Sequence, residues 1–130
     1  MTESFEARIA KAREHVNSIS PEDIEARLAS DPKTLLLDVR DEGGRSAGVI
    51  PGSTNVSLGT LFFKADQTSP YHDAETFPDL DHPIVCTCTG GGQAAVAADL
   101  LKDYGYTNVT IAEGGAKGWA ASGRTIDDPQ

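Results

Sequence analysis

The 130-residue sequence is poor in cysteine, in basic residues and in long apolar runs, and each shortage excludes a class of protein. Two cysteines are too few for the disulfide framework of a small secreted domain. The net charge of −9 argues against binding to nucleic acid or to an anionic membrane surface. No apolar run approaches the ~20 residues that a membrane-spanning helix needs. The first residues are acidic and lack the apolar core of a secretory signal, so we expect one cytoplasmic domain.

The most informative segment is 83–103, in which a strand, a glycine-rich turn and a helix follow one another. Residues 84–86 form a short apolar run, which predicts a buried strand. Residues 93–103 are rich in Ala and Leu at helical spacing, which predicts a helix. Cys88 and three successive glycines lie between them. A cysteine is therefore expected where a parallel strand ends and a helix begins, which is the edge at which open α/β sheets bind ligands.

That position favours a reactive thiol. The first N–H groups of a helix have no partner inside the helix, and the helix dipole adds partial positive charge there. Successive glycines let the backbone curl so that several N–H groups converge on one point. We therefore expect the Cys88 thiol to ionise more readily than a free thiol, and the loop to stabilise an anion carried on its sulfur.

Strands and helices alternate along the rest of the chain, which predicts a parallel sheet with right-handed crossovers. An apolar stripe across 3–16, which begins at Phe5, predicts a helix docked on the flank of the domain, since it is too short for a convincing coiled coil. Ser20 and Pro21 begin a second helix. We expect an N-terminal amphipathic helix over 1–17, one domain over 18–124 and a tail over 125–130 that is frayed from residue 127.

The longest irregular stretch is 64–83, and a loop of that length in a compact domain is often functional. Tyr71 and His72 within it are candidates for the mouth of the site, although a single histidine in a loop is more often only solvated. Trp119, the only tryptophan, is interpreted as a core anchor rather than a ligand platform.

Four segments of the chain resemble, in the right order, motifs of the single-domain rhodanese-like sulfurtransferases. Residues 88–93 and the following helix resemble the family's active-site loop. Segments 35–40 and 48–56 resemble its Asp-Val-Arg and Gly-His-Ile-Pro-Gly-Ala motifs, with Val49 where histidine is usual, and 113–119 resembles its Glu-Gly-Gly…Trp motif. The resemblance covers residue 19 to about residue 123. It implies an α/β, rhodanese-like fold, with a central five-stranded, mostly parallel sheet flanked by helices on both sides.

The resemblance also implies a mechanism. The Cys88 thiolate attacks a sulfane sulfur donor and becomes a persulfide, and an acceptor then removes the outer sulfur, which predicts ping-pong kinetics. Backbone amides of the loop hold the persulfide as oxyanion-hole donors hold developing charge. These amides belong to Thr89, Gly90, Gly91, Gly92 and Gln93. Asp38 and Arg40 form a supporting ion pair, and neither a metal nor an organic cofactor is required.

The resemblance implies two partners, a sulfur donor and a thiol acceptor. The donor is a small molecule or a protein, and carries the sulfur as thiosulfate, a polysulfide or a persulfide. The chain itself is expected to be a monomer or a weak homodimer. Many close relatives end the loop with arginine, whose guanidinium grips an anionic donor, whereas Gln93 offers one neutral amide. This departure favours polysulfide or persulfide donors over thiosulfate. It also motivates a second hypothesis, a catalytically weak sulfur-binding or regulatory module on the same fold.

A third hypothesis, a cysteine phosphatase or arsenate reductase, needs a longer loop with a terminal arginine and therefore ranks last.

Cys86 lies two residues before Cys88, so both side chains face the same side of an extended strand. We interpret Cys86 as a buried core residue, with a resolving thiol for Cys88 as the alternative. A Cys-x-Cys pair without further ligands nearby is a poor metal site.

Overall fold

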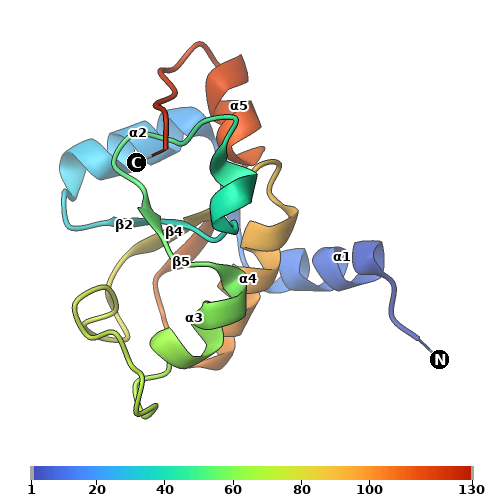
Figure 1. Cartoon of the computed structure of the whole chain (residues 1–130), viewed down its shortest axis with the longest axis vertical. Helices are drawn as coiled ribbons and strands as arrows, with labels where there is room; N and C mark the ends of the chain where they lie inside the picture. Colours follow the sequence, from blue (N-terminus) through green and yellow to red (C-terminus); the bar gives the residue numbers. More distant parts are fainter. Residues whose placement is uncertain (1, 130) are drawn as a thin grey trace.

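Five strands form the centre of the structure, a computed structural model that describes residues 2–129 (Figure 1). They are β1 (Ser18–Ile19), β2 (Leu35–Asp38), β3 (Thr54–Asn55), β4 (Ile84–Thr87) and β5 (Val109–Ala112). Their order across the sheet is β1-β5-β4-β2-β3, and every neighbouring pair is parallel. The five-stranded sheet is therefore confirmed. Because the strands run in one direction, their carboxyl ends share one edge, with β4 at its middle.

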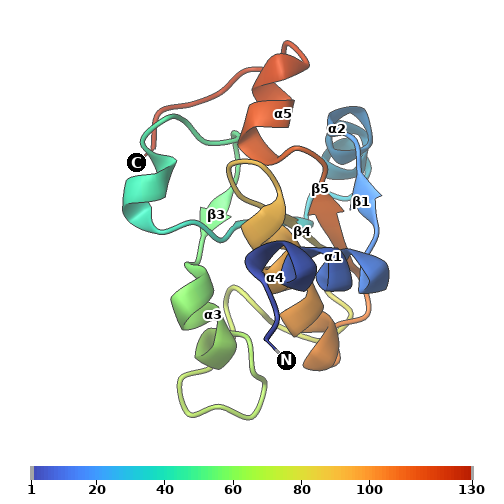
Figure 2. The same ribbon diagram turned by 90° about the vertical axis from the view of Figure 1, so that its right-hand side faces the viewer.

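Helices cover both faces of the sheet (Figures 1 and 2). One face carries α1 (Phe5–His15), α3 (Leu58–Lys64) and α4 (Gly92–Asp103), and the other carries α2 (Pro21–Ser30) and α5 (Gly115–Ala121). A short 3-10 helix, η1 (Glu42–Arg45), follows β2. Alternate strand residues point to opposite faces, so each layer of helices packs on its own apolar core. Among residues 2–129, no helix combines the length and the apolar character needed to cross a membrane.

Local signals set the helix starts. The Ser20 hydroxyl accepts a hydrogen bond from the Asp23 N–H at 3.1 Å, with Pro21 at the first helical position of α2. The Ser4 hydroxyl accepts from the Ala7 N–H at 3.0 Å and begins α1 in the same way. These caps satisfy N–H groups that have no partner within their own helix.

The N-terminal helix packs only part of its apolar stripe against the domain. Ala12 and Val16 are buried beside α4, and Ile9 is partly buried there. Phe5, expected to share that face, is 76% exposed. The reason is visible in Figure 1, where the first turns of α1 extend away from the body of the domain. The stripe therefore docks through its second half.

The tail, expected to be frayed from residue 127, returns to the domain instead. The Trp119 indole N–H donates to the Thr125 carbonyl at 2.8 Å. Asp127 and Val49 then exchange two backbone hydrogen bonds, each 2.9 Å between N and O, as an isolated antiparallel bridge. Gln130 lies outside the described residues. Trp119 is buried in the core between α5 and the sheet, as interpreted from the sequence.

The long segment 65–83 lies at the wrong edge of the sheet to reach Cys88. It leads into the amino end of β4, and Leu80 accepts a backbone hydrogen bond from Thr107, just before β5. His72 places Nε2 2.9 Å from the Phe77 carbonyl, and Tyr71 packs edge-on against Phe63. The prediction that Tyr71 and His72 line the mouth of the site is therefore wrong, because a segment entering a parallel strand arrives opposite the ligand-binding edge.

Candidate functional site

Cys88 is the first residue after the central strand β4. The residue is 2% exposed, and its side chain packs with the core between the sheet and α4. Its Sγ accepts a hydrogen bond from the Gly91 N–H, with 2.9 Å between nitrogen and sulfur. Gly91 has a φ of 109°, a conformation that side-chain-bearing residues rarely adopt. The glycine-rich turn thus folds one backbone donor back onto the sulfur.

The first turn of α5 supports the loop over residues 88–93, the Cys88 loop, from the other side. The Cys88 carbonyl accepts from the Ala116 N–H at 2.8 Å, and the Thr89 carbonyl accepts from the Lys117 N–H at 3.0 Å. In a trans peptide the C=O and the following N–H point in opposite directions. The N–H groups of Thr89 and Gly90 therefore point away from the α5 donors.

Gly115 makes this support possible. It has a φ of +60°, and a Cβ built on it would lie 2.5 Å from the Cys88 carbonyl oxygen and 2.7 Å from that of Thr89. Both contacts are shorter than real Cβ atoms make, and both involve backbone that is already hydrogen-bonded. The second glycine of the 113–119 motif therefore has a direct role, which is to let α5 approach the Cys88 loop.

A buried charge cluster stands beside the loop, where β2 ends. The Asp38 carboxylate is fully buried and accepts hydrogen bonds from the Arg40 backbone N–H (3.1 Å), Nε (3.1 Å) and Nη2 (2.9 Å). Arg45 adds a second guanidinium, with its Nε 3.4 Å from Asp38 Oδ2. Arg40 Nη1 also reaches the Thr89 hydroxyl at 3.4 Å. The pair expected from the sequence is present and connects the Cys88 loop to the 41–48 loop.

Sequence reasoning missed Arg45. It lies in a polar, glycine-containing loop, where an arginine carries no signal of burial, yet it is only 9% exposed. Nothing in the local pattern distinguishes it from a solvated surface residue.

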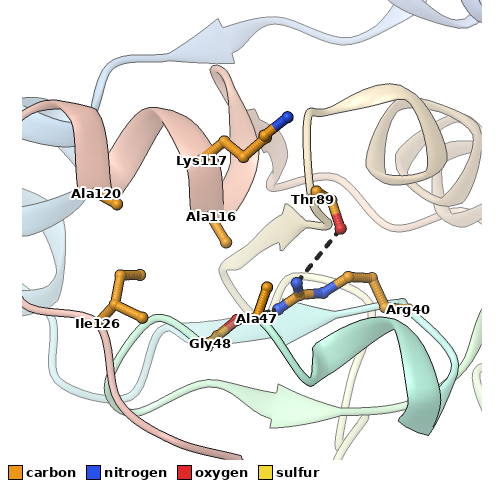
Figure 3. A pocket seen from close by; sticks show the side chains of 8 residues that line it. All are labelled: Arg40, Ala47, Gly48, Thr89, Ala116, Lys117, Ala120 and Ile126. Atoms are coloured by element: carbon orange, nitrogen blue, oxygen red, sulfur yellow. Dashed lines mark hydrogen bonds between the residues drawn. The ribbon is translucent and has the colours of Figure 1, made fainter.

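A cavity of about 170 Å³ opens beside Thr89, on the α5 side of the loop (Figure 3). Arg40, Thr89 and Lys117 supply its polar side chains, and small apolar groups supply most of its wall. The apolar wall is formed by Ala47, Ala116, Ala120 and Ile126. Cys88 does not line this cavity, because its side chain lies on the opposite face, beneath α4.

Cys86 is fully buried in the same core as Cys88 and makes no disulfide. Burial raises the pKa of its thiol well above the ordinary value, and the nearby Cys88 raises it further. The thiol therefore stays protonated at neutral pH and is a poor nucleophile. This supports the interpretation of Cys86 as a core residue rather than a resolving thiol.

The rest of the loop faces outward. Thr89, Gly90 and Gln93 are exposed, and the Gln93 side chain makes no hydrogen bond to any residue in the range 2–129. A Cβ built on Gly90 would meet no atom within 4 Å. The crest of the loop is thus open, although the sulfur beneath it is covered. Residues 2–129 contain no cluster of three or more side chains suited to a metal ion.

The N-terminal helix covers the other flank of the loop. Figure 2 shows α1 crossing α4, and His15 Nδ1 lies 2.9 Å from Asp99 Oδ1 of α4. A Cβ built on Gly92 would lie 2.9 Å from Ile9 Cδ1, and one on Gly91 would lie 3.2 Å from Arg13 Nη2. Sequence reasoning missed Arg13 as well, since no pattern linked this helix to the loop.

Comparison with known proteins agrees with this geometry. The family model for the rhodanese-like domain matches residues 20–122. A curated protein named sulfurtransferase from Allochromatium vinosum is 29% identical over 115 residues, which cover 88% of this chain and 98% of that protein.

Solved structures resemble the chain over nearly its whole length. The structure of a Rhodopseudomonas palustris protein of unknown function, described as a possible tyrosine phosphatase, is 30% identical, with a TM-score of 0.87 and coverage of 98% and 96% of the two chains. The polysulfide-sulfur transferase homodimer of Wolinella succinogenes is 27% identical, with a TM-score of 0.75 and coverage of 97% and 88%. With its sheet, its Cys88 loop and the match over residues 20–122, the chain belongs to the rhodanese-like domain family.

Proposed function

We propose that the protein is a sulfurtransferase that carries a sulfane sulfur as a persulfide on Cys88. The observation that carries this proposal is the hydrogen bond from the Gly91 N–H to the Cys88 Sγ, in a glycine turn held by the first turn of α5. Such a turn stabilises negative charge on sulfur before and after the transfer. The sulfurtransferase and polysulfide-sulfur transferase names of two relatives support the same reaction class.

The reaction proceeds in two displacements. The Cys88 thiolate attacks the sulfane sulfur of the donor, a new S–S bond forms, and the donor's S–S bond breaks with its electron pair leaving on the departing group. An acceptor thiolate then attacks the outer sulfur of the persulfide and releases the Cys88 thiolate. With thiosulfate the leaving group is sulfite, and with a persulfide or polysulfide it is a thiolate or a shorter polysulfide. Each displacement conserves charge and needs no cofactor.

The burial of Cys88 limits which donors reach it. At 2% exposure the sulfur admits a narrow, small molecule, or a persulfide at the end of an extended side chain, but not a bulky surface. Because Cys86 stays protonated, a single thiol carries the sulfur. Asp38, Arg40 and Arg45 hold the surrounding loops, and this supporting role requires no contact with the donor.

Intact mass spectrometry tests the proposal. The protein and its Cys88→Ser and Cys86→Ser variants are incubated briefly with thiosulfate and, separately, with polysulfide. We expect a gain of about 32 Da, one sulfur atom, that requires Cys88 and survives the loss of Cys86. Turnover is then followed with an acceptor thiol. An adduct that forms without turnover would favour the sulfur-binding or regulatory module, and no adduct from any donor would refute the sulfurtransferase.

Phosphatase chemistry is the candidate that the name of the R. palustris structure raises. A phosphate clamp needs a cation at the end of the loop, and this position holds the neutral, exposed Gln93. We therefore expect no appreciable hydrolysis of an aryl phosphate by the unmodified protein. Activity that depends on Cys88 would overturn that ranking.

A further inference from the structure

We propose that Arg13 binds the anionic end of the sulfur donor and thereby selects small dianionic donors, such as thiosulfate, over donors without a second charge. This inference rests on the sulfurtransferase proposed above and assigns a donor class to the same Cys88 site. In this protein the cation that recognises the donor comes from the N-terminal helix rather than from the end of the loop.

Arg13 is placed to reach a donor bound at Cys88. Arg13 lies where α1, the Cys88 loop and the turn between β5 and α5 meet. A Cβ built on Gly91 would lie 3.2 Å from Arg13 Nη2 and 3.8 Å from both the Ala112 carbonyl oxygen and the Gly114 nitrogen. Gly91 is also the residue whose N–H contacts the Cys88 sulfur. The guanidinium therefore rests against the residue that holds the reacting atom.

The charge of Arg13 is available to a donor. Within residues 2–129 its guanidinium makes no ion pair and no side-chain hydrogen bond, and the residue is exposed. The two arginines on the other side of the loop, Arg40 and Arg45, are both paired with Asp38. A donor approaching the loop thus meets one unneutralised guanidinium on the α1 side.

An anionic donor needs a cation close to Cys88. The net charge of −9 repels anions at long range, so an anionic donor requires a local cation. Gln93 does not supply one. A guanidinium offers parallel N–H donors that match the oxygens of a sulfonate group, which a neutral amide cannot do.

Packing holds helix α1 over the loop. The His15–Asp99 contact joins the end of α1 to α4, and Ala12 is buried one residue before Arg13. Glycine at 92 gives Ile9 room against the loop, because a Cβ there would lie only 2.9 Å from Ile9 Cδ1. The position of Arg13 is therefore set by packing, and the donor need not order a free segment.

In the transfer, the Cys88 thiolate attacks the outer sulfur of thiosulfate, and the S–S bond breaks with its electron pair leaving on sulfite. Negative charge moves from the Cys88 sulfur through the transferred atom to the departing sulfite. Arg13 contacts the sulfonate oxygens in the bound donor and the sulfite as it forms. An alkyl hydropersulfide has no sulfonate and leaves as a thiolate, so Arg13 makes no comparable contact with it.

The test measures persulfide formation on Cys88 by rapid quench and intact mass spectrometry for the full chain and three variants, Arg13→Ala, Arg13→Lys and Arg8→Ala. Arg8 is the matched control, since it is exposed on the same helix and pairs with Glu3. The donors are thiosulfate and an alkyl hydropersulfide. We expect Arg13→Ala to raise the half-saturating thiosulfate concentration about five- to tenfold, with Lys in between and Arg8→Ala unchanged. The effect shrinks at high salt.

The outcomes separate the two proposals. If Arg13→Ala matches Arg8→Ala with thiosulfate, the role of Arg13 is refuted while the sulfurtransferase stands. If Arg13→Ala slows both donors equally, Arg13 acts only on the structure of the loop, and the donor-binding role is again refuted. If no donor places a sulfur on Cys88 of the unmodified protein, both proposals fail together.

Discussion

Replacing Gly115 with alanine tests whether the contact between α5 and the Cys88 loop maintains the site. The new Cβ would lie 2.5 Å from the Cys88 carbonyl oxygen and 2.7 Å from the Thr89 carbonyl oxygen, so the helix and the loop must separate. Gly115→Ala also places a side chain at a φ of +60°, which costs about 1 kcal/mol. Weakening the two hydrogen bonds to Ala116 and Lys117 costs about 1 kcal/mol each.

The expected loss is therefore about 3 kcal/mol in the free energy of unfolding, or roughly 10 °C in Tm for a domain of this size. Gly123→Ala is the control, since Gly123 follows the same helix with a φ of +87° and a Cβ there would meet no atom within 4 Å. In the control variant, only the backbone strain lowers the free energy of unfolding, by about 1 kcal/mol. The difference in stability loss between the two variants therefore measures the effect of the steric contact with the loop.

Urea unfolding and persulfide formation on Cys88 are measured for both variants. We expect Gly115→Ala to slow persulfide formation even at temperatures where it is fully folded, because the loop carbonyls lose their partners. Gly123→Ala should form the persulfide at the rate of the unmodified protein. Equal losses of stability in the two variants, or an unchanged rate in Gly115→Ala, would refute the role assigned to this contact.

Three further predictions concern buried groups. Cys88→Ser abolishes persulfide formation in the mass assay, whereas Cys86→Ser retains it and unfolds at lower urea concentration, because its buried hydroxyl costs about 1–3 kcal/mol if it finds no partner; the reverse pattern would identify Cys86 as the nucleophile. Asp38→Asn leaves two buried guanidiniums without their carboxylate and lowers the free energy of unfolding by about 3–5 kcal/mol in urea titrations, while a loss under 1 kcal/mol would show that water replaces the carboxylate. Burial raises the pKa of Cys86, so above the ordinary thiol pKa of 9.0 the unfolded chain releases a proton that the folded chain keeps, and stability falls as pH rises, by about 1.4 kcal/mol per pH unit relative to Cys86→Ala; parallel stability curves for the two proteins would contradict this.

Several features followed from the sequence because they are set by short-range rules. The β4 strand, the glycine turn and α4 are adjacent in the chain, so an apolar run, three glycines and an alanine-rich helix were sufficient to place Cys88 at a strand end. The cap at Ser20 is equally local. Cys86 and Cys88 face the same side of the sheet because strand side chains repeat every two residues, and both enter the same core. The sheet itself was expected from the alternation of elements and from family motifs.

Other features depended on which segments the fold brings together. The strand order β1-β5-β4-β2-β3 puts Asp38 beside Thr87 and brings the turn before α5 against the Cys88 loop. It also places residues 65–83, which include Tyr71, at the edge of the sheet opposite Cys88. None of these contacts is encoded by neighbouring residues.

The sequence by itself determined the place of Cys88 at a strand end, the glycine turn and the class of fold. Only the tertiary structure decided that Gly115 admits α5 to the loop carbonyls, that Arg45 shares Asp38, and that Arg13 rests on Gly91. The physical reason is the range of the interactions. Backbone propensity and side-chain period act within a few residues, whereas steric fit and charge pairing act between surfaces whose meeting depends on the whole arrangement of strands and helices.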